Sequence, residues 1–302
     1  MKKLTGFLLA ILAFAVVSIS FTSCGEPEES DDPNVPNVPE ETVAGVYNPR
    51  KKISKIYVQK EGEQEYLLQD WEWEGNKLGF ITYYEEGRFK AKNEFIYEGD
   101  RLVKVVGEGQ LGYHTEYFYI GKKFEKINYY KPTGDISAEC RFLYQGDKIT
   151  NVIVNRYNSY GVGKDAISVI EKSLIGAEKL VNQVDTFTHF FDFLYEGENL
   201  ISISQPSGPF FTLEGYDKCF NVMYNFFPFA TVLYAPFPFS VIDTDLDVFL
   251  FSKNNPRKVT YEFYQAITTY TYTYDDHYPI TIQSNMVVGD RHEETIYRIL
   301  YQ

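Results

Sequence analysis

Alternating carboxylates are the first pattern in this sequence with chemistry in it. Asp243, Asp245 and Asp247 are spaced so that their carboxylates could converge on one hard cation such as Ca²⁺. A calcium loop of this type also needs a glycine at its sharp turn and a bidentate glutamate at its end. Val248 and Asn254 stand at those positions. We therefore predict a solvated strand edge here and no metal site.

Catalytic motifs are the second place to look for chemistry. The sequence has no Gly-x-Ser-x-Gly elbow, phosphate loop or Cys-x-x-Cys pair, and His292-Glu293 lacks the second histidine of a zinc-protease helix. The other histidines, His114, His189 and His277, have no spacing that suggests shared ligation. We predict no catalytic residue, no metal and no cofactor, and hence a protein that is not an enzyme.

Two cysteines, Cys140 and Cys219, lie in the main part of the chain. They could form a disulfide in an oxidising compartment, although two cysteines so far apart in sequence do not make a disulfide framework. Both states, paired and unpaired, are left open by the sequence.

Aromatic rings next to prolines stand out in residues 226–239. Proline interrupts strand pairing, so these rings are expected in loops or at a sheet edge. They either plug one mouth of a barrel or form an exposed apolar patch of the kind that marks a binding site. The candidate ligand-contact residues are Phe227, Phe229, Tyr234, Phe237 and Phe239.

An internal repeat indicates the elements that would position such residues. Each copy has the pattern aromatic-x-aromatic-x-Gly-x-x-apolar, which reads as two short strands around a two-residue turn that starts with glycine. The copies lie at residues 71–78, 95–102, 117–124, 142–149 and 193–200.

The turn fixes which residues face each other across a hairpin. With Gly99-Asp100 as the turn, Glu98 faces Arg101 and Tyr97 faces Leu102. The other hairpins then pair Trp73 with Leu78, Tyr119 with Phe124, Tyr144 with Ile149 and Tyr195 with Leu200. Each hairpin sets an aromatic ring opposite an apolar partner, and such cross-strand pairs stabilise a sheet.

Strict alternation along these strands puts Phe95 and Tyr97 on one face and Ile96, Val103 and Val105 on the other. Both faces are then partly apolar, so each needs a cover. Rings stack on sugars as well as in cores, and we expect this ladder to be core. Its members are Trp71, Trp73, Tyr97, Tyr119, Tyr144 and Tyr195.

The spacing from Gly146 to Gly197 is about twice the others, which suggests that one hairpin was lost or overwritten. At most one short helix is expected there, near residues 165–180, because apolar residues recur with a helical period. The hairpin arms look five to seven residues long, shorter than the roughly 9–11 residues of a membrane-spanning strand. We therefore expect a soluble barrel and no pore.

The N-terminus has the layout of an export signal. Lys2 and Lys3 precede an apolar run over residues 7–19 that is too short to span a bilayer. The residues that follow resemble the lipobox of bacterial lipoproteins, with Phe21 in the place of the usual leucine and Cys24 at the cleavage point. The resemblance implies a signal peptide over residues 1–23 and a lipid-modified Cys24 that anchors the protein to a membrane.

Residues 24–44 are rich in proline and acidic residues, a composition that cannot offset its ordering entropy. We predict a disordered tether. Acidic residues directly after the cysteine also resemble the surface-export signals of Bacteroidetes lipoproteins. That likeness implies an outer-membrane location, lipid-anchored and exposed at the cell surface.

The signal, the tether and the hairpin repeats together resemble a family of uncharacterised Bacteroidetes lipoproteins, a domain of unknown function with a porin-like fold. Three further short motifs add to the likeness: residues 216–221, 252–256 and 274–279. The resemblance implies an all-β fold, in which residues 45–302 form one antiparallel meander that curls into an open or closed barrel. It implies no activity.

The formal net charge of −13, without a basic stripe, makes a nucleic-acid partner unlikely to form. We predict a surface-tethered, non-catalytic module that binds a glycan or a peptide on aromatic side chains. The alternative is a structural or assembly protein whose second apolar face docks a partner in an outer-membrane complex.

Overall fold

The protein is described here from a computed structural model, in residues 49–109, 114–158, 185–224, 226, 251–262 and 265–302. The regular elements of these ranges are sixteen β-strands. They are β1 (Ile53–Lys60), β2 (Tyr66–Glu74), β3 (Lys77–Glu85), β4 (Arg88–Glu98), β5 (Arg101–Gly109), β6 (His114–Ile120), β7 (Lys123–Tyr130), β8 (Ile136–Gln145), β9 (Lys148–Asn158), β10 (Asp185–Glu196), β11 (Asn199–Gln205), β12 (Gly208–Glu214), β13 (Lys258–Tyr261), β14 (Ala266–Asp275), β15 (Tyr278–Val288) and β16 (Arg291–Tyr301).

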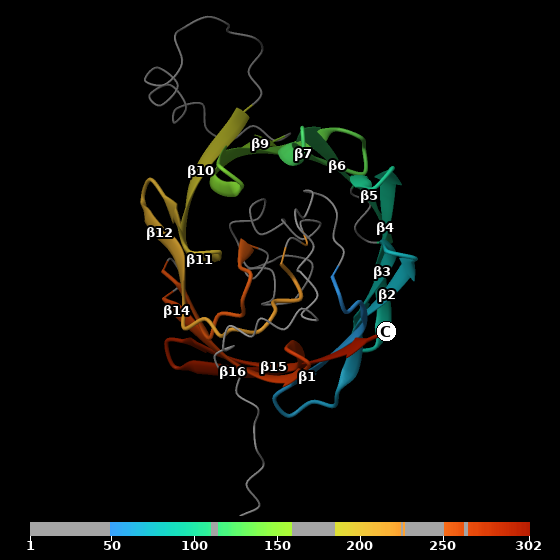
Figure 1. Cartoon of the computed structure of the whole chain (residues 1–302), viewed down its shortest axis with the longest axis vertical. Helices are drawn as coiled ribbons and strands as arrows, with labels where there is room; N and C mark the ends of the chain where they lie inside the picture. The colour runs from blue at the N-terminus through green and yellow to red at the C-terminus, as the bar shows by residue number, and fades with distance from the viewer. Residues whose placement is uncertain (1–48, 110–113, 159–184, 225, 227–250, 263–264) are drawn as a thin grey trace, which may run out of the picture.

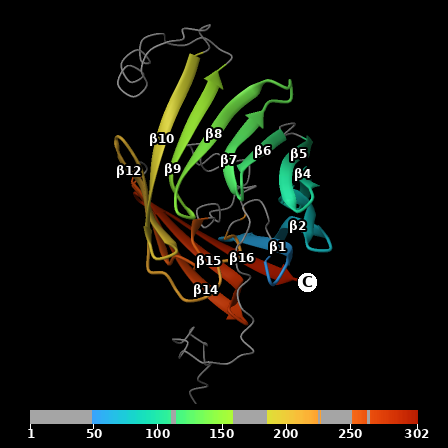
Figure 2. The same cartoon turned by 45° about the horizontal axis from the view of Figure 1, so that its top comes forward.

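The strands form a closed antiparallel barrel in which each strand pairs with its neighbours in sequence and β1 pairs with β16. Figure 1 looks into the ring, and Figure 2 shows the strands inclined along the wall. The all-β meander predicted from the repeats is confirmed, and of the two alternatives, open or closed, the barrel is closed. A closed sheet has no free edge strand.

The predicted hairpin registers are confirmed. Tyr97 pairs with Leu102 and Glu98 with Arg101, and the four other aromatic–apolar pairs form as expected. Gly99 has a φ of 59°, the left-handed conformation that such a turn requires and that glycine adopts without steric cost.

Strict alternation was wrong just beyond each turn. In the β4–β5 hairpin Ile96 pairs with Lys104, so Val103 is an extra residue, a β-bulge. The bulge shifts the alternation by one, and Val105 pairs with Phe95 and is buried beside it on the inner face. The outer face is therefore less apolar than the sequence suggested.

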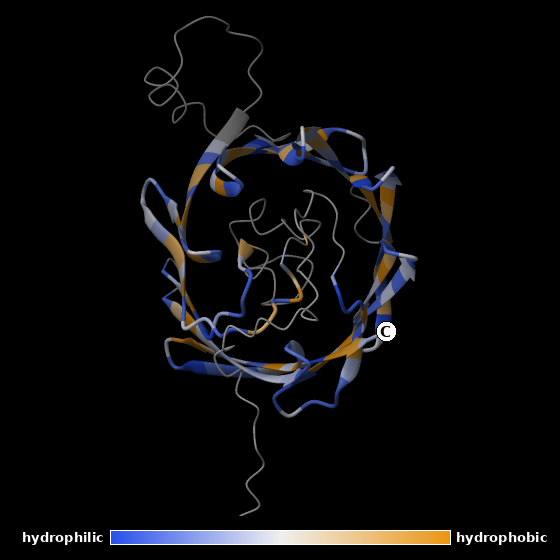
Figure 3. Cartoon of the chain, viewed as in Figure 1, coloured by the Kyte–Doolittle hydropathy of each residue, from blue (hydrophilic) through white to orange (hydrophobic). Residues whose placement is uncertain are grey.

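The two faces of the wall differ in chemistry. Buried apolar side chains line the inside, and orange and blue residues alternate along the strands in Figure 3. On the outside, oppositely charged side chains of adjacent strands pair, with Nζ–oxygen distances of 3.1–3.3 Å. These pairs are Lys92–Glu72, Lys104–Glu116 and Lys126–Glu139.

Successive hairpins are also linked at one end of the barrel, the glycine rim, formed by the turns at Gly75, Gly99, Gly121, Gly146 and Gly197. There a cation two residues after each glycine reaches the carbonyl of the next turn. Lys77 Nζ donates to the Gly99 carbonyl at 2.6 Å, and Arg101 to the Gly121 carbonyl at the same distance. The cations also lie over the rings of the next hairpin, for example Arg101 over Tyr119.

Two further expectations need correction. No hairpin is missing between Gly146 and Gly197, because β9 pairs directly with β10 and the extra length lies in their connection. The strands are also longer than expected, with arms of up to 12 residues, so length alone does not exclude a spanning barrel. The predicted helix near residues 165–180 lies outside the described residues.

Candidate binding site in the sixth hairpin

The sixth hairpin, made by β12 and β13, departs from the others. Its strands pair normally, with Leu213 opposite Val259 and Glu214 opposite Lys258. Tyr216 then donates its hydroxyl hydrogen to the Leu200 carbonyl, as the ring of another hairpin does one repeat earlier. In place of a two-residue turn, however, the chain makes a long excursion, residues 217–255, which we call the insertion.

The described ends of the insertion lie inside the barrel, within the ring of strands in Figure 1. Phe226 is fully buried, with its ring centroid 5.0 Å from that of Trp71 and 6.3 Å from that of Phe95. On the other arm of the insertion, Phe251 packs edge-on against Phe193 at 5.0 Å. These contacts fill the lumen with aromatic side chains and fix the insertion to the wall.

One carboxylate ties the two arms of the insertion to the barrel. Asp217 Oδ1 accepts hydrogen bonds from the backbone amides of Cys219, at 3.0 Å, and Asn255, at 3.3 Å. Asp217 Oδ2 accepts a hydrogen bond from the hydroxyl of Tyr274, on β14. Because one side chain joins three segments, its removal should loosen all of them.

Deeper in the lumen, a second set of polar groups joins the same arms. Asn221 Nδ2 donates to the Ser252 carbonyl at 2.7 Å, and Asn221 Oδ1 accepts from the Met223 amide at 3.0 Å. Ser252 Oγ accepts from the Leu200 amide at 3.1 Å and lies 2.9 Å from the Tyr216 hydroxyl. Asn221 and Ser252 are buried, and buried polar groups with partners specify one arrangement.

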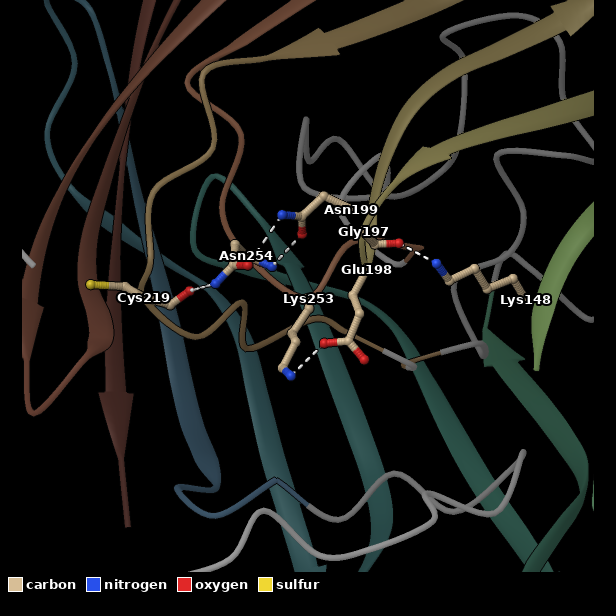
Figure 4. A network of polar contacts seen from close by, with 7 residues as sticks. All are labelled: Lys148, Gly197, Glu198, Asn199, Cys219, Lys253 and Asn254. Carbon is tan, nitrogen blue, oxygen red and sulfur yellow. Dashed lines mark hydrogen bonds and ion pairs between the residues drawn. The ribbon is translucent and has the colours of Figure 1, made fainter. Parts of the chain in front are cut away.

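At the glycine rim the insertion takes the place of the next hairpin turn (Figure 4). The residue two positions after Gly197 is Asn199, where earlier hairpins have a cation. Asn199 exchanges two hydrogen bonds with Asn254, at 3.1 and 3.0 Å. Beside it, the Lys253 amide donates to the Glu198 carbonyl and the side chains of these two residues form an ion pair.

The candidate residues of the sequence analysis fall into two groups. Phe227, Phe229, Tyr234, Phe237 and Phe239 lie outside the described residues. So do Cys24 and the aspartates at 243, 245 and 247. The ring ladder is described and packs in or against the hydrophobic core, as expected.

The two cysteines do not pair with each other, because Cys140 is a free thiol on the inner face of β8. Burial raises its pKa to about 12. A thiol that stays protonated at neutral pH is a poor nucleophile and a poor metal ligand. Cys140 is therefore a small apolar residue of the core.

The histidines are separate from one another. His114 stacks on Tyr130 on the outer face at 4.4 Å, and partial burial, together with Lys104, lowers its pKa. Burial and the nearby Arg156 lower the pKa of His189 on β10. Within the part of the chain that the structure describes, no three His, Cys, Asp or Glu side chains come together as metal ligands would.

Sequence reasoning missed the polar anchors of the insertion. Asp217, Ser252, Asn255 and Tyr274 come from the three short motifs noted for the family resemblance, and the structure brings these motifs together at the sixth and seventh hairpins. Their richness in Asp, Asn and Ser was a usable signal, but nothing in the sequence indicated that they meet.

No protein-family model matches the chain, and no curated protein matches it. Two solved structures that share the barrel are a porin-like protein from Bacteroides uniformis and a porin-like protein from Bacteroides vulgatus. The first is 12% identical with a TM-score of 0.39, over 85% of this chain and 100% of that chain. The second is 11% identical with a TM-score of 0.26, over 83% of this chain and 99% of that chain. Among the described residues, no helix is long and apolar enough to cross a membrane.

Proposed function

We propose that this protein is a non-catalytic binding module for a glycan or a peptide, tethered by lipid on Cys24 to the outer membrane and exposed at the cell surface. The observation that carries the binding role is the insertion, a long segment set into one turn of an otherwise repetitive barrel and fixed at both ends. Rigid scaffolds that hold such segments place their functional residues on them. The insertion also contains the five candidate rings from Phe227 to Phe239.

The polarity of the wall supports a water-exposed barrel attached through its tether. A charged side chain facing lipid near the bilayer midplane costs about 2–4 kcal/mol. The outer face carries ion pairs along several adjacent strands, among them Lys92–Glu72 and Lys126–Glu139. The apolar residues instead face inward, where Phe226 and its neighbours occupy the lumen. This arrangement favours a packed, soluble domain over a conducting pore.

A thermal-shift screen of the full chain against neutral and acidic glycans and mucin peptides tests the binding role. A ligand that binds only the folded protein raises the melting temperature by mass action. We expect a saturable rise that disappears when Phe227, Phe229, Tyr234, Phe237 and Phe239 are replaced by serine. The matched control is Phe89→Ser, which removes a ring that is 59% exposed at the outer wall. A flat response to the whole panel would count against a binding module.

The second candidate function is docking of an envelope protein. One observation favours it: Ile96, Ile120, Leu143 and Leu194 are exposed on the outer face near the glycine rim, with Ile120 67% exposed. A partner that uses this row should be recovered in stoichiometric amount by the wild-type protein from native membranes. It should be lost from the Leu143→Glu, Leu194→Glu variant, whereas the five-ring variant should keep it.

A further inference from the structure

The outer face of β14 and β15 differs from the rest of the wall. Between Ile267 and Thr273 on one strand, and between Thr281 and Val287 on the other, no outward side chain is charged. We call this surface the threonine face. It consists of Thr269, Thr271, Thr273, Thr281, Gln283 and Asn285.

The threonine face is a regular array. The register places Thr269 opposite Asn285, Thr271 opposite Gln283 and Thr273 opposite Thr281. Successive rows are roughly 6.6 Å apart along the strands, and paired residues are about 4.8 Å apart across them. Such an array presents hydroxyl and amide groups at fixed intervals.

Contacts within the face hold its side chains in place. Thr271 Oγ1 donates to Gln283 Oε1 at 3.4 Å, and the hydroxyls of Thr273 and Thr281 are hydrogen-bonded to each other. The three threonines of β14 are exposed. Strand propensity accounts for threonine, but asparagine is depleted in strands, so Asn285 needs another reason.

The chemistry of the face selects its ligand. Hydroxyl and primary amide groups both donate and accept hydrogen bonds, as sugar hydroxyls do. With no charge in the array, an ionic ligand finds no counter-charge there, whereas the outer faces of β2–β8 carry cross-strand ion pairs. A peptide cannot add as a further strand, because the closed barrel has no free edge.

From this array we infer that the threonine face binds a neutral polysaccharide chain through hydrogen bonds to its hydroxyls. The face lies on the outside of the wall, whereas the anchors of the insertion lie in the lumen. The inference therefore goes beyond the proposed function and names a second, separate surface.

Native affinity electrophoresis of the mature lipidated chain in detergent tests the inference. The probes are hydroxyethyl cellulose, pullulan and galactomannan, with polygalacturonate as the anionic comparison. We expect at least one neutral polysaccharide to retard the wild-type protein. Thr271→Glu should weaken that dissociation constant at least tenfold while leaving the near-ultraviolet circular dichroism unchanged.

The matched control is Thr188→Glu. Thr188 is exposed on β10 and donates to Asn155 Oδ1 at 2.9 Å, a cross-strand contact like that of Thr271 but outside the face. The inference is overturned if no neutral polysaccharide retards the wild-type protein, or if Thr271→Glu is retarded equally. It is also overturned if retardation is lost only in the five-ring variant of the insertion, a result that would support the proposed function instead.

Discussion

The hydroxyl of Tyr119 donates a 2.6 Å hydrogen bond to the backbone carbonyl of Leu102, one hairpin earlier in the chain. Leu102 directly precedes the bulge residue Val103, where the regular ladder is interrupted and a carbonyl needs another donor. Equivalent bonds recur around the barrel: Trp73 Nε1 to Ile53 and the Tyr301 hydroxyl to Pro279, each at 2.7 Å, and the Tyr272 hydroxyl to Pro256 at 2.5 Å. Each hairpin thus closes the bulge of its neighbour.

Tyr119→Phe tests this link. It removes the donor but keeps the ring, so the Leu102 carbonyl loses its partner. We expect the free energy of unfolding to fall by about 1–3 kcal/mol, the cost of an unsatisfied buried polar group. Urea denaturation measures the change. The control is Tyr57→Phe on the outer face, which should change stability by less than about 0.5 kcal/mol. Equal effects in both variants would contradict the link.

Gly99→Ala tests the hairpin turns. Gly99 has a φ of 59°, and an added Cβ would meet no atom within 4 Å, so the cost is purely conformational. We expect a loss of about 1–2 kcal/mol in the free energy of unfolding. Gly99→Asn should cost less, because asparagine tolerates this conformation. If alanine is the milder replacement, the turn does not have the described conformation.

Asp217→Asn tests the anchor of the insertion. Asparagine keeps one acceptor but loses the carboxylate that Cys219, Asn255 and Tyr274 share. We expect a loss of about 1–3 kcal/mol, the range for hydrogen bonds to a charged group. Asp147→Asn is the control, since its 98% exposed carboxylate pairs with Lys123 at the surface and such pairs contribute little. Similar effects at both positions would argue against the anchor.

Alkaline pH should destabilise the barrel through its buried tyrosines. Burial raises the pKa of Tyr97 to about 12, while an unfolded tyrosine titrates near 10. The folded state resists ionisation, so the stabilisation is complete below pH 10 and is lost as the pH rises toward 12. Melting temperatures across this window should fall, and Tyr97→Phe should reduce the slope. A melting temperature that is constant between pH 10 and 12 would contradict the burial of these rings.

Cys24→Ala tests the anchor to the membrane. Without the thiol no diacylglycerol can be attached, so we expect the protein to move from the membrane pellet to the soluble fraction and to lose metabolic palmitate label. Cys140→Ala is the control and should keep both, because Cys140 is buried in the barrel wall. A Cys24→Ala protein that stays in the pellet after a carbonate wash would point to attachment by another route.

The sequence predicted the hairpins well because the turn glycines and the facing aromatic pairs are local signals. Five hairpins were recognised, whereas the barrel has eight. In the sixth, the insertion separates Tyr216 from Pro256, and in the seventh the turn is Asp276-His277 without glycine. The eighth joins β16 to β1, so its two arms lie at opposite ends of the chain.

The bulges and the polar anchors were beyond a sequence reading for a different reason. A bulge such as that at Val103 depends on how two strands align over several residues, and single-strand alternation carries no trace of it. The cluster around Asp217 depends on closure of the barrel, which brings β14 next to the arms of the insertion.

The seam between β1 and β16 gives the barrel a mechanical property. β1 begins at the glycine rim, where Lys52 reaches the Gly75 carbonyl, and it is hydrogen-bonded to both β2 and β16. These bonds run perpendicular to the strand. A force applied to the chain ahead of Ile53 along the strand direction therefore loads both rows in shear, with many bonds sharing the load. The barrel should resist tension on its N-terminal side far better than peeling from a free edge.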